Sequence, residues 1–240
     1  MIPISEILGP TIQGEGHFIG QKVIFIRTAG CDYQCKWCDT KYAWAGNDPY
    51  TEMTPKEVFQ AVFNLSGLYN CSHVVITGGN PCIIGDEMEE LIEYLQNQHY
   101  HVSVETQGSI WQDWLSEVNH VVISPKPPSS GITTNWETLE AFRDNLYPSM
   151  YSIKVVIFDD EDYEYARQVN ALFEEEMNLV MYLQVGTPVI VGDSSLDAMR
   201  AIVLGRLNWL VSKVVADKDM NEVRVLPQLH TLIWGNRRGV

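Results

Sequence analysis

Short apolar segments alternate along this chain with segments that have the spacing of amphipathic helices, and this alternation constrains the fold most strongly. Apolar runs predict strands at residues 23–27, 74–77, 102–105, 121–124, 153–158 and 180–185, with a last short strand at 222–226. Helical patterns lie between them, most clearly at 55–65, 86–98, 160–174 and 194–211. Strands that alternate with helices indicate βαβ units around a parallel sheet.

About six such units are fewer than the eight of a closed TIM barrel. We therefore expect an α/β fold, an open, partial TIM-like barrel that residues 1–240 form as a single domain. A flat, doubly wound sheet is the alternative. In both architectures the active site lies at the carboxyl ends of the strands.

Two helix starts carry capping signals. Thr54, Pro55 and Glu57 predict an N-cap, a proline in the first turn and a capping box. Asp86 is the expected N-cap of the helix at 86–98.

The charge balance excludes some functions and leaves others open. The chain has 16 basic and 31 acidic residues, a net charge of −15, which disfavours a nucleic-acid-binding surface or docking on an anionic membrane. No apolar run is long enough to span a bilayer, and residues 1–6 do not resemble a signal peptide. We therefore expect a cytoplasmic protein.

A C-x3-C-x2-C run, formed by Cys31, Cys35 and Cys38, follows the first predicted strand. Clustered cysteines in a reducing compartment indicate a metal or redox site. Structural zinc normally takes four ligands, so a zinc site would have to recruit His17 or His73. Thiolates also hold iron–sulfur clusters, and three of them leave one iron of a 4Fe–4S cluster open to another ligand. The other two cysteines, Cys71 and Cys82, are expected to be buried thiols.

This run, with Trp37 before its third cysteine, resembles the signature of the radical S-adenosylmethionine (SAM) superfamily. Thr77-Gly78-Gly79-Asn80-Pro81 resembles the Gly-Gly-Glu-Pro motif of that superfamily, with Asn80 in place of the usual Glu. The resemblance implies a modified radical SAM core, a 4Fe–4S cluster whose open iron binds SAM, and reductive cleavage of SAM to a 5′-deoxyadenosyl radical.

Further segments resemble the 7-carboxy-7-deazaguanine synthases, a radical SAM family, over almost the whole chain. They are residues 9–16, 27–31, 38–40, 78–81, 105–108, 124–127 and 223–230. The resemblance implies that 6-carboxy-5,6,7,8-tetrahydropterin is converted to 7-carboxy-7-deazaguanine with loss of ammonia, in 7-deazapurine (queuosine) biosynthesis. It also implies that SAM is regenerated and that Mg2+ is required.

The resemblance assigns roles to particular positions. Beyond the three cluster cysteines it implies Thr40 as the Mg2+ ligand. The implied SAM-binding residues are Trp37, Cys38, Asp39, Gly79, Glu105, Ser124, Pro125 and Lys126. The implied substrate-binding residues are Ile12, Gln13, Gly14, Arg27 and Thr77. No catalytic residue is assigned beyond the radical itself.

Several of these positions have a second reading. Arg27 suits a substrate carboxylate, although an arginine at a strand end also often forms a salt bridge. Glu105 suits ribose hydroxyls, or pairs with a basic residue in the barrel. Gln184, Gln228 and His230 are expected near strand ends as well, and their roles, like that of Glu15, are left open.

Two other functions remain open at this stage. One is another small radical SAM enzyme, such as an activating enzyme for a glycyl-radical protein. The other is a non-catalytic zinc-binding module. The family resemblance also implies a homodimer and a reducing partner such as flavodoxin.

Overall fold

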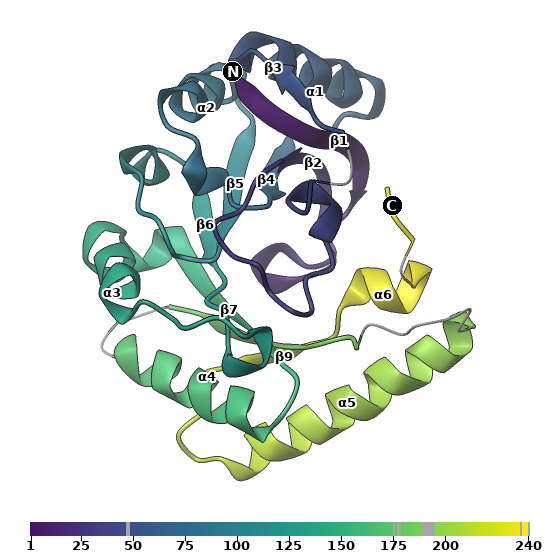
Figure 1. Cartoon of the computed structure of the whole chain (residues 1–240), viewed down its shortest axis with the longest axis vertical. Coiled ribbons are helices and arrows are strands. Elements are labelled where there is room, and N and C mark those ends of the chain that lie inside the picture. The colour runs from purple at the N-terminus through teal and green to yellow at the C-terminus, as the bar shows by residue number, and fades with distance from the viewer. Residues whose placement is uncertain (47–48, 175, 177–178, 189–194, 236, 240) are drawn as a thin grey trace.

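One curved sheet with helices along its outer side organises the residues that the structure, a computed structural model, describes: 1–46, 49–174, 176, 179–188, 195–235 and 237–239 (Figure 1). The strands are β1 (Ile2–Ile12), β2 (Lys22–Thr28), β3 (Thr51–Met53), β4 (His73–Gly78), β5 (His101–Thr106), β6 (His120–Ile123), β7 (Tyr151–Ile157), β8 (Met181–Val185) and β9 (Arg224–Leu226). The α-helices are α1 (Pro55–Tyr69), α2 (Asp86–Asn97), α3 (Trp136–Asn145), α4 (Asp160–Leu172), α5 (Leu196–Ala216) and α6 (Leu229–Trp234).

The strand order is β3-β1-β2-β4-β5-β6-β7-β8-β9, and every neighbouring pair from β2 to β9 is parallel. Among the described strands β3 and β9 are the edges and do not pair with each other, so the sheet stays open. The predicted partial, open barrel is confirmed, and the flat doubly wound alternative is not what forms. Each predicted strand is present within a few residues of its expected position.

Side chains alternate between the two faces of each strand. In β2, Ile24 and Ile26 belong to the large core under the helices, whereas Val23 and Phe25 pack on the inner face. In β7, Val155 lies in the helix-side core, so its neighbour Lys154 points to the inner face. This alternation decides which polar residues reach the interior of the barrel.

The amino-terminal segment forms a strand that the sequence analysis did not predict. Residues 9–12, rich in turn-forming residue types, belong to β1, which pairs antiparallel with β2 and β3. The register between β1 and β2 shifts between Leu8 and Thr11, where Gly9 has φ of +128°. A Cβ at Gly9 would lie 2.9 Å from the carbonyl oxygen of Val23, so this irregular pairing needs glycine.

The helix starts follow the capping signals only in part. Thr54 caps α1: its side chain accepts from the backbone N–H of Glu57, whose carboxylate accepts from the backbone N–H of Thr54. Asp86, the expected cap of α2, is its first helical residue, and Gly85 occupies the cap position. An acidic residue in the first turn still favours the helix through its dipole.

The crossovers also depart from the sequence pattern. A 3-10 helix at Asp113–Ser116 replaces an α-helix between β5 and β6. The helix expected at 194–211 begins at Leu196 and continues to Ala216, while residue 194 lies outside the described residues. The short helix α6 follows β9, and the backbone N–H of Leu229 at its start donates to the carbonyl of Gly14 at 3.0 Å (Figure 1).

Histidines close the amino-terminal end of the barrel. His73, His101 and His120 are the first residues of β4, β5 and β6, and they surround Phe18 at ring-centroid distances of 4.5, 5.5 and 5.2 Å. His17 stacks on His120 at 4.1 Å. His17 and His73 therefore lie at the opposite end of the strands from the cysteine run, which removes the ligands that a zinc site would have recruited.

No helix in the described part of the chain has both the length and the apolar character needed to cross a membrane.

Candidate active site

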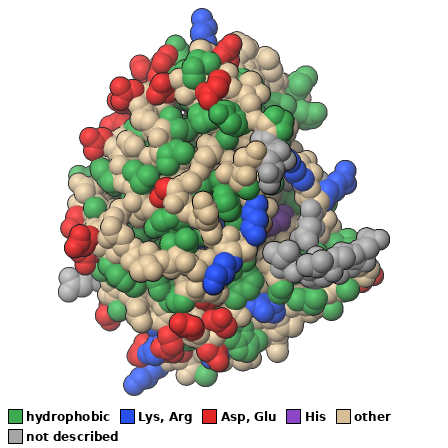
Figure 2. Space-filling model, in the orientation of Figure 1, with side chains coloured by type: hydrophobic (Ala, Val, Ile, Leu, Met, Phe, Trp, Pro, Cys, Tyr) green, Lys and Arg blue, Asp and Glu red, His purple; other side chains and the backbone are tan. Residues whose placement is uncertain are grey.

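A cavity of about 630 Å³ lies at the carboxyl ends of the parallel strands, where the fold class places an active site. It brings together predicted site residues from all parts of the chain. They are Ile12, Gln13, Gly14, Arg27, Cys31, Cys35, Trp37, Cys38, Asp39, Thr40, Thr77, Gly79, Glu105, Ser124 and Lys126. Pro125 is the predicted position that does not line it. Figure 2 shows Lys and Arg side chains beside a hollow in which a His is visible, while Asp and Glu gather away from it.

The three cysteines lie on the loop after β2 and share one wall of the cavity. N–H groups point at two of the sulfurs: Trp44 Nε1 lies 3.2 Å from Cys38 Sγ, and Gln107 Nε2 lies 3.6 Å from Cys31 Sγ. Burial, with Cys38 and Cys31 nearby, raises the pKa of Cys35 to about 11, although Lys126 opposes the rise. The positive charge of a metal centre stabilises cysteine thiolates, and N–H donors to sulfur are typical of iron–sulfur sites. The donor set therefore fits a 4Fe–4S cluster with one open iron.

The Gly78-Gly79 turn at the end of β4 brings two backbones into direct contact. The backbone N–H of Gly79 donates to the carbonyl of Thr28 at 3.1 Å. A Cβ at Gly79 would lie 1.7 Å from the carbonyl oxygen of Gly30 and 3.1 Å from Cβ of Cys31. The glycine thus lets the strand end lie against the start of the cysteine loop.

Asn80, which replaces the usual Glu, is fully buried and points away from the cavity. Its amide donates to Asp32 at 2.8 Å and to Ser109 at 3.1 Å, and its carbonyl accepts from Thr106 at 2.9 Å. Asp32 in turn accepts from Gln107 at 2.7 Å. Asn80 therefore anchors the cysteine loop to the strand ends from behind.

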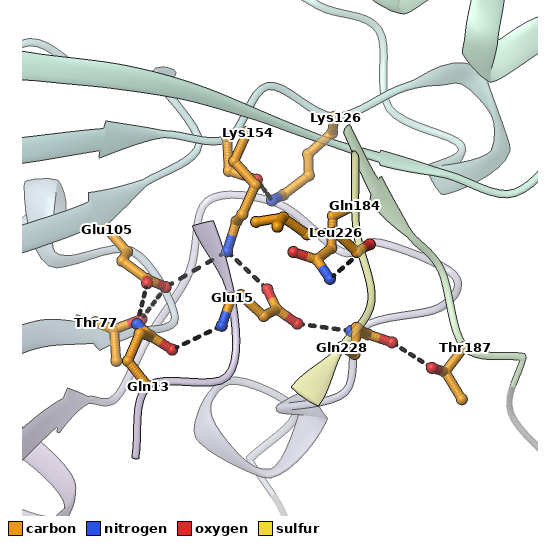
Figure 3. A network of polar contacts seen from close by, with 11 residues as sticks. Gln13, Glu15, Thr77, Glu105, Lys126, Lys154, Gln184, Thr187, Leu226 and Gln228 are labelled. Carbon is orange, nitrogen blue, oxygen red and sulfur yellow. Dashed lines mark hydrogen bonds and ion pairs between the residues drawn. The ribbon is translucent and has the colours of Figure 1, made fainter. Parts of the chain in front are cut away.

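A buried ion-pair network occupies the inner wall (Figure 3). Lys154 Nζ lies 2.7 Å from Oε2 of Glu15 and 3.7 Å from Oε2 of Glu105. Gln13 donates to Glu105 at 2.7 Å, and Gln228 donates to Glu15 at 2.6 Å. Burial alone would raise the pKa of Glu15, but Lys154 and, to a smaller degree, His230 and Gln228 lower it well below its usual range. The sequence reading missed Lys154, whose only signal was a charge inside an apolar strand.

Arg27 lies on the inner face of β2 and already has an ionic partner. Its Nε is 2.9 Å from Oε1 of Glu6, which also accepts from the hydroxyl of Tyr42 at 2.8 Å. The guanidinium of Arg238 lies 3.7 Å from the centroid of the Tyr42 ring. Arg27 therefore forms the salt bridge that was its second reading. It also lines the cavity, and its contact with a substrate carboxylate stays a prediction. Glu6 and Tyr42 were not singled out from the sequence.

The remaining candidates divide into cavity residues and buried ones. Thr40 lines the cavity, and its hydroxyl lies 3.5 Å from Cys38 Sγ. Lys126 also lines the cavity and donates to Ser124 at 3.2 Å.

Two residues without an assigned role lie in different surroundings. Gln184 is fully buried and does not line the cavity; its amide donates to the carbonyl of Leu226. His230 packs directly against Gly14, where a Cβ would lie 2.3 Å from its ring.

Ligand atoms of Glu15, Asp39 and His230 lie within 4.8 Å of one another. Both oxygens of Glu15 already bind Lys154 and Gln228, so we assign no metal to this group.

Comparison with known proteins agrees with this geometry. Residues 25–184 match the radical SAM superfamily. The chain is 45% identical to the 7-carboxy-7-deazaguanine synthase of Bacillus cereus, over 100% of this chain and 99% of that protein. It is 44% identical to the enzyme of the same name from Bacillus subtilis, over 100% and 98%. The crystal structure of QueE from Escherichia coli is similar with a TM-score of 0.64 and 26% identity, covering 95% of this chain and 94% of that one.

The open barrel and its three-cysteine wall are those of a radical SAM enzyme. That class implies a 4Fe–4S cluster and SAM as cofactors. Within it, the chain belongs to the 7-carboxy-7-deazaguanine synthase family, whose members are lyases.

Proposed function

We propose that this enzyme converts 6-carboxy-5,6,7,8-tetrahydropterin to 7-carboxy-7-deazaguanine with loss of ammonia, as a step of 7-deazapurine biosynthesis. The observation that carries the proposal is one cavity whose lining joins the three cysteines to a buried, charged wall suited to a polar heterocycle. Full-length similarity to enzymes with this activity in their name supports it. A glycyl-radical activating enzyme would instead need to admit a protein segment.

Cys31, Cys35 and Cys38 would hold the cluster, and the open iron would bind SAM. When bound, the cluster and SAM would supply hydrogen-abstraction chemistry through a 5′-deoxyadenosyl radical, in a cycle that would regenerate SAM. Gly79 would admit the methionine part of SAM through its bare backbone. Trp37, Asp39, Ser124, Pro125 and Lys126 would bind the remainder of SAM, and the Glu105 carboxylate would accept from its ribose.

The substrate would bind between the end of β1 and the inner face of β2. Ile12, Gln13 and Gly14 would bind its ring edge, with Thr77 at the end of β4. Arg27 would bind the substrate carboxylate by exchanging Glu6 for it, because a guanidinium can bind a carboxylate through two hydrogen bonds. Enclosure in the cavity would keep water from the radical.

Thr40 would be the protein ligand of Mg2+. Its neutral hydroxyl lines the cavity, and Mg2+ commonly keeps several ligands from substrate and water rather than from protein. The ion would neutralise and orient the substrate carboxylate.

The whole chain would act as a single radical SAM domain in the cytoplasm, as a homodimer with an acidic reductant such as flavodoxin. The described strands, which lie between residues 2 and 226, all belong to one sheet, in support of a single domain. Exposed apolar side chains on one side of α5, Leu204, Val211 and Val215, support contact with a second copy. Exposed Lys36 and Lys41 next to the cysteine loop support docking of an acidic protein. Light scattering on the purified protein tests the dimer: a monomer at micromolar concentration would contradict it.

An anaerobic assay tests the reaction. Reconstituted protein is mixed with 6-carboxy-5,6,7,8-tetrahydropterin, SAM, Mg2+ and a strong reductant, and products are measured by mass spectrometry. We expect many molecules of 7-carboxy-7-deazaguanine per SAM consumed. Release of 5′-deoxyadenosine without this product, from protein with a full cluster, would reject the substrate and favour another radical SAM reaction.

A further inference from the structure

Lys154 is the most deeply buried charge on the inner wall, and no role has been assigned to it so far. We propose that Lys154 is a positioning residue that fixes the segment of residues 13–16, which follows β1, in the conformation that binds substrate. This inference rests on the proposed function, because that segment carries the proposed contacts to the pterin ring. Lys154 would act through Glu15 rather than by touching the substrate.

Lys154 comes from the middle of β7 and is the one charged residue of that strand. Its side chain is 7% exposed and reaches from the inner face of the sheet to the segment after β1. There it meets Glu15, which is 14% exposed, at 2.7 Å. An ion pair this short and this shielded is held more firmly than a surface pair, because water screens it little.

The aliphatic part of Lys154 supports the same segment. Gly16 has φ of +60°, and a Cβ there would lie 3.4 Å from Cδ of Lys154. The backbone after Glu15 thus passes directly over the lysine stem. Both the charge and the stem of Lys154 therefore define where residues 15 and 16 lie.

Further hydrogen bonds connect the Lys154–Glu15 pair to Gln13 and Gly14, which are proposed to bind the pterin ring. Glu105, the second carboxylate near Lys154, accepts from the amide of Gln13, and Gln13 accepts from the backbone N–H of Glu15. On the other side Glu15 accepts from Gln228, next to the backbone of Leu229, which donates to the carbonyl of Gly14. Figure 3 shows Lys154 between Glu15 and Glu105, with Gln228 bound to the first carboxylate and Gln13 to the second.

A buried lysine at this position is not expected to make the fold more stable than an apolar residue would. Replacing buried ion pairs by apolar residues of similar size is often neutral or stabilising, whereas removing one partner leaves an uncompensated charge. Lys154→Met should therefore free the segment by leaving Glu15 and Glu105 as two buried carboxylates without a cation. Lys154→Met/Glu15→Gln removes the unpaired charge on the segment and should recover part of what the single change loses.

The experiment measures two affinities on the reconstituted holoenzyme, by anaerobic calorimetry without reductant so that no turnover occurs. The ligands are 6-carboxy-5,6,7,8-tetrahydropterin and SAM. The proteins are wild type, Lys154→Met, Lys154→Met/Glu15→Gln and, as a matched control, Lys213→Met, which removes a surface lysine paired with Asp160. Iron content and thermal transitions confirm that each protein is folded.

We expect the Kd for the pterin to rise at least about tenfold in Lys154→Met, equal to about 1.4 kcal/mol. The Kd for SAM should change less than about threefold, the double variant should bind the pterin more tightly than the single one, and Lys213→Met should match wild type. An unchanged pterin Kd in folded Lys154→Met, or an equal rise in both Kd values, would overturn the inference.

If Lys154→Met does not fold, the double variant decides. Pterin binding weaker than in wild type, with SAM binding retained, supports the inference; wild-type pterin binding, or failure of both variants to fold, overturns it. A wild-type protein that binds SAM but neither binds nor converts the pterin instead rejects the proposed function.

Discussion

The Nζ atom of Lys154 on β7 lies 2.7 Å from Oε2 of Glu15, a residue 139 positions earlier in the chain. Gln228, 213 positions after Glu15, donates to the other oxygen of the same carboxylate. The first and last parts of the chain thus meet at one side chain in the wall of the cavity. The cysteine run, by contrast, is assembled from eight consecutive residues.

The cysteines of the run should differ from the other two in iron binding. Cys35→Ala and Cys38→Ala should each lose most of the bound iron, because the cluster then has only two thiolate ligands. Cys71→Ala is the matched control, since Cys71 is a buried free thiol whose sulfur lies near the backbone carbonyls of Lys22 and His73. Iron and sulfide analysis after anaerobic reconstitution measures the effect. Full iron content in Cys38→Ala would contradict the assignment of the ligands.

Gly79 and Gly67 should respond in opposite ways to alanine. The new methyl group at Gly79 would lie 1.7 Å from the carbonyl oxygen of Gly30, so Gly79→Ala should displace the cysteine loop and weaken SAM binding more than about tenfold. At Gly67, inside α1, a Cβ meets nothing within 4 Å. Gly67→Ala should therefore raise the free energy of unfolding by about 0.4 to 1 kcal/mol. SAM titration and denaturant unfolding of both variants check the contrast, and equal behaviour would contradict it.

The capping box of α1 should contribute measurably to stability. Thr54→Ala removes the acceptor for the Glu57 N–H and should lower the free energy of unfolding by about 0.5 to 2 kcal/mol. Thr54→Ser keeps a hydroxyl at the cap and should stay close to wild type. Urea unfolding monitored by circular dichroism measures both. A loss as large in Thr54→Ser as in Thr54→Ala would show that the hydroxyl is not what matters.

The histidines at the amino-terminal end of the barrel should make stability fall with acid. Burial lowers the pKa of His73 to about 4 and that of His120 to about 3, and neighbouring histidines add to both shifts. In the unfolded chain these histidines have a pKa near 6.5, so between about pH 6.5 and pH 4 they bind protons that they do not bind in the folded chain. Stability is complete above about pH 7 and should decrease as the pH falls below about 6.5, by about 1 to 2 kcal/mol per histidine at pH 5.

Urea unfolding between pH 5 and pH 7.5 measures that slope, and most carboxylates stay ionised in this window. His120→Gln, which keeps a polar side chain near Ser152, should flatten the slope. An equal slope in wild type and His120→Gln would show that the acid sensitivity arises elsewhere.

Features that depend on short stretches of sequence could be predicted without the structure. The parallel strands, the capping box at Thr54 and the three-cysteine loop depend on periodicity, on contacts three residues apart and on a run of eight residues. Because parallel strands end at one edge, the sequence also determined that Arg27, Thr77 and Glu105 would share a site. Where the local signal was weak, no strand was predicted: Gly9 and Pro10 are turn-forming residue types, yet they lie within β1, which pairs with β2 on both sides of them.

The tertiary structure alone decided how the charged wall is built. No local pattern could pair Lys154 with Glu15, or Glu6 with Arg27 and Tyr42, since these contacts join residues far apart in the sequence. The structure likewise decided that the buried Asn80 donates a hydrogen bond to Asp32 on the cysteine loop. It also decided that His17 and His73 lie at the opposite end of the strands from the cysteines. The physical reason is the same in each case: the chain order determines which strands form and what their ends carry, whereas the partner of a buried polar group depends on which side chains the curved, open sheet packs against it.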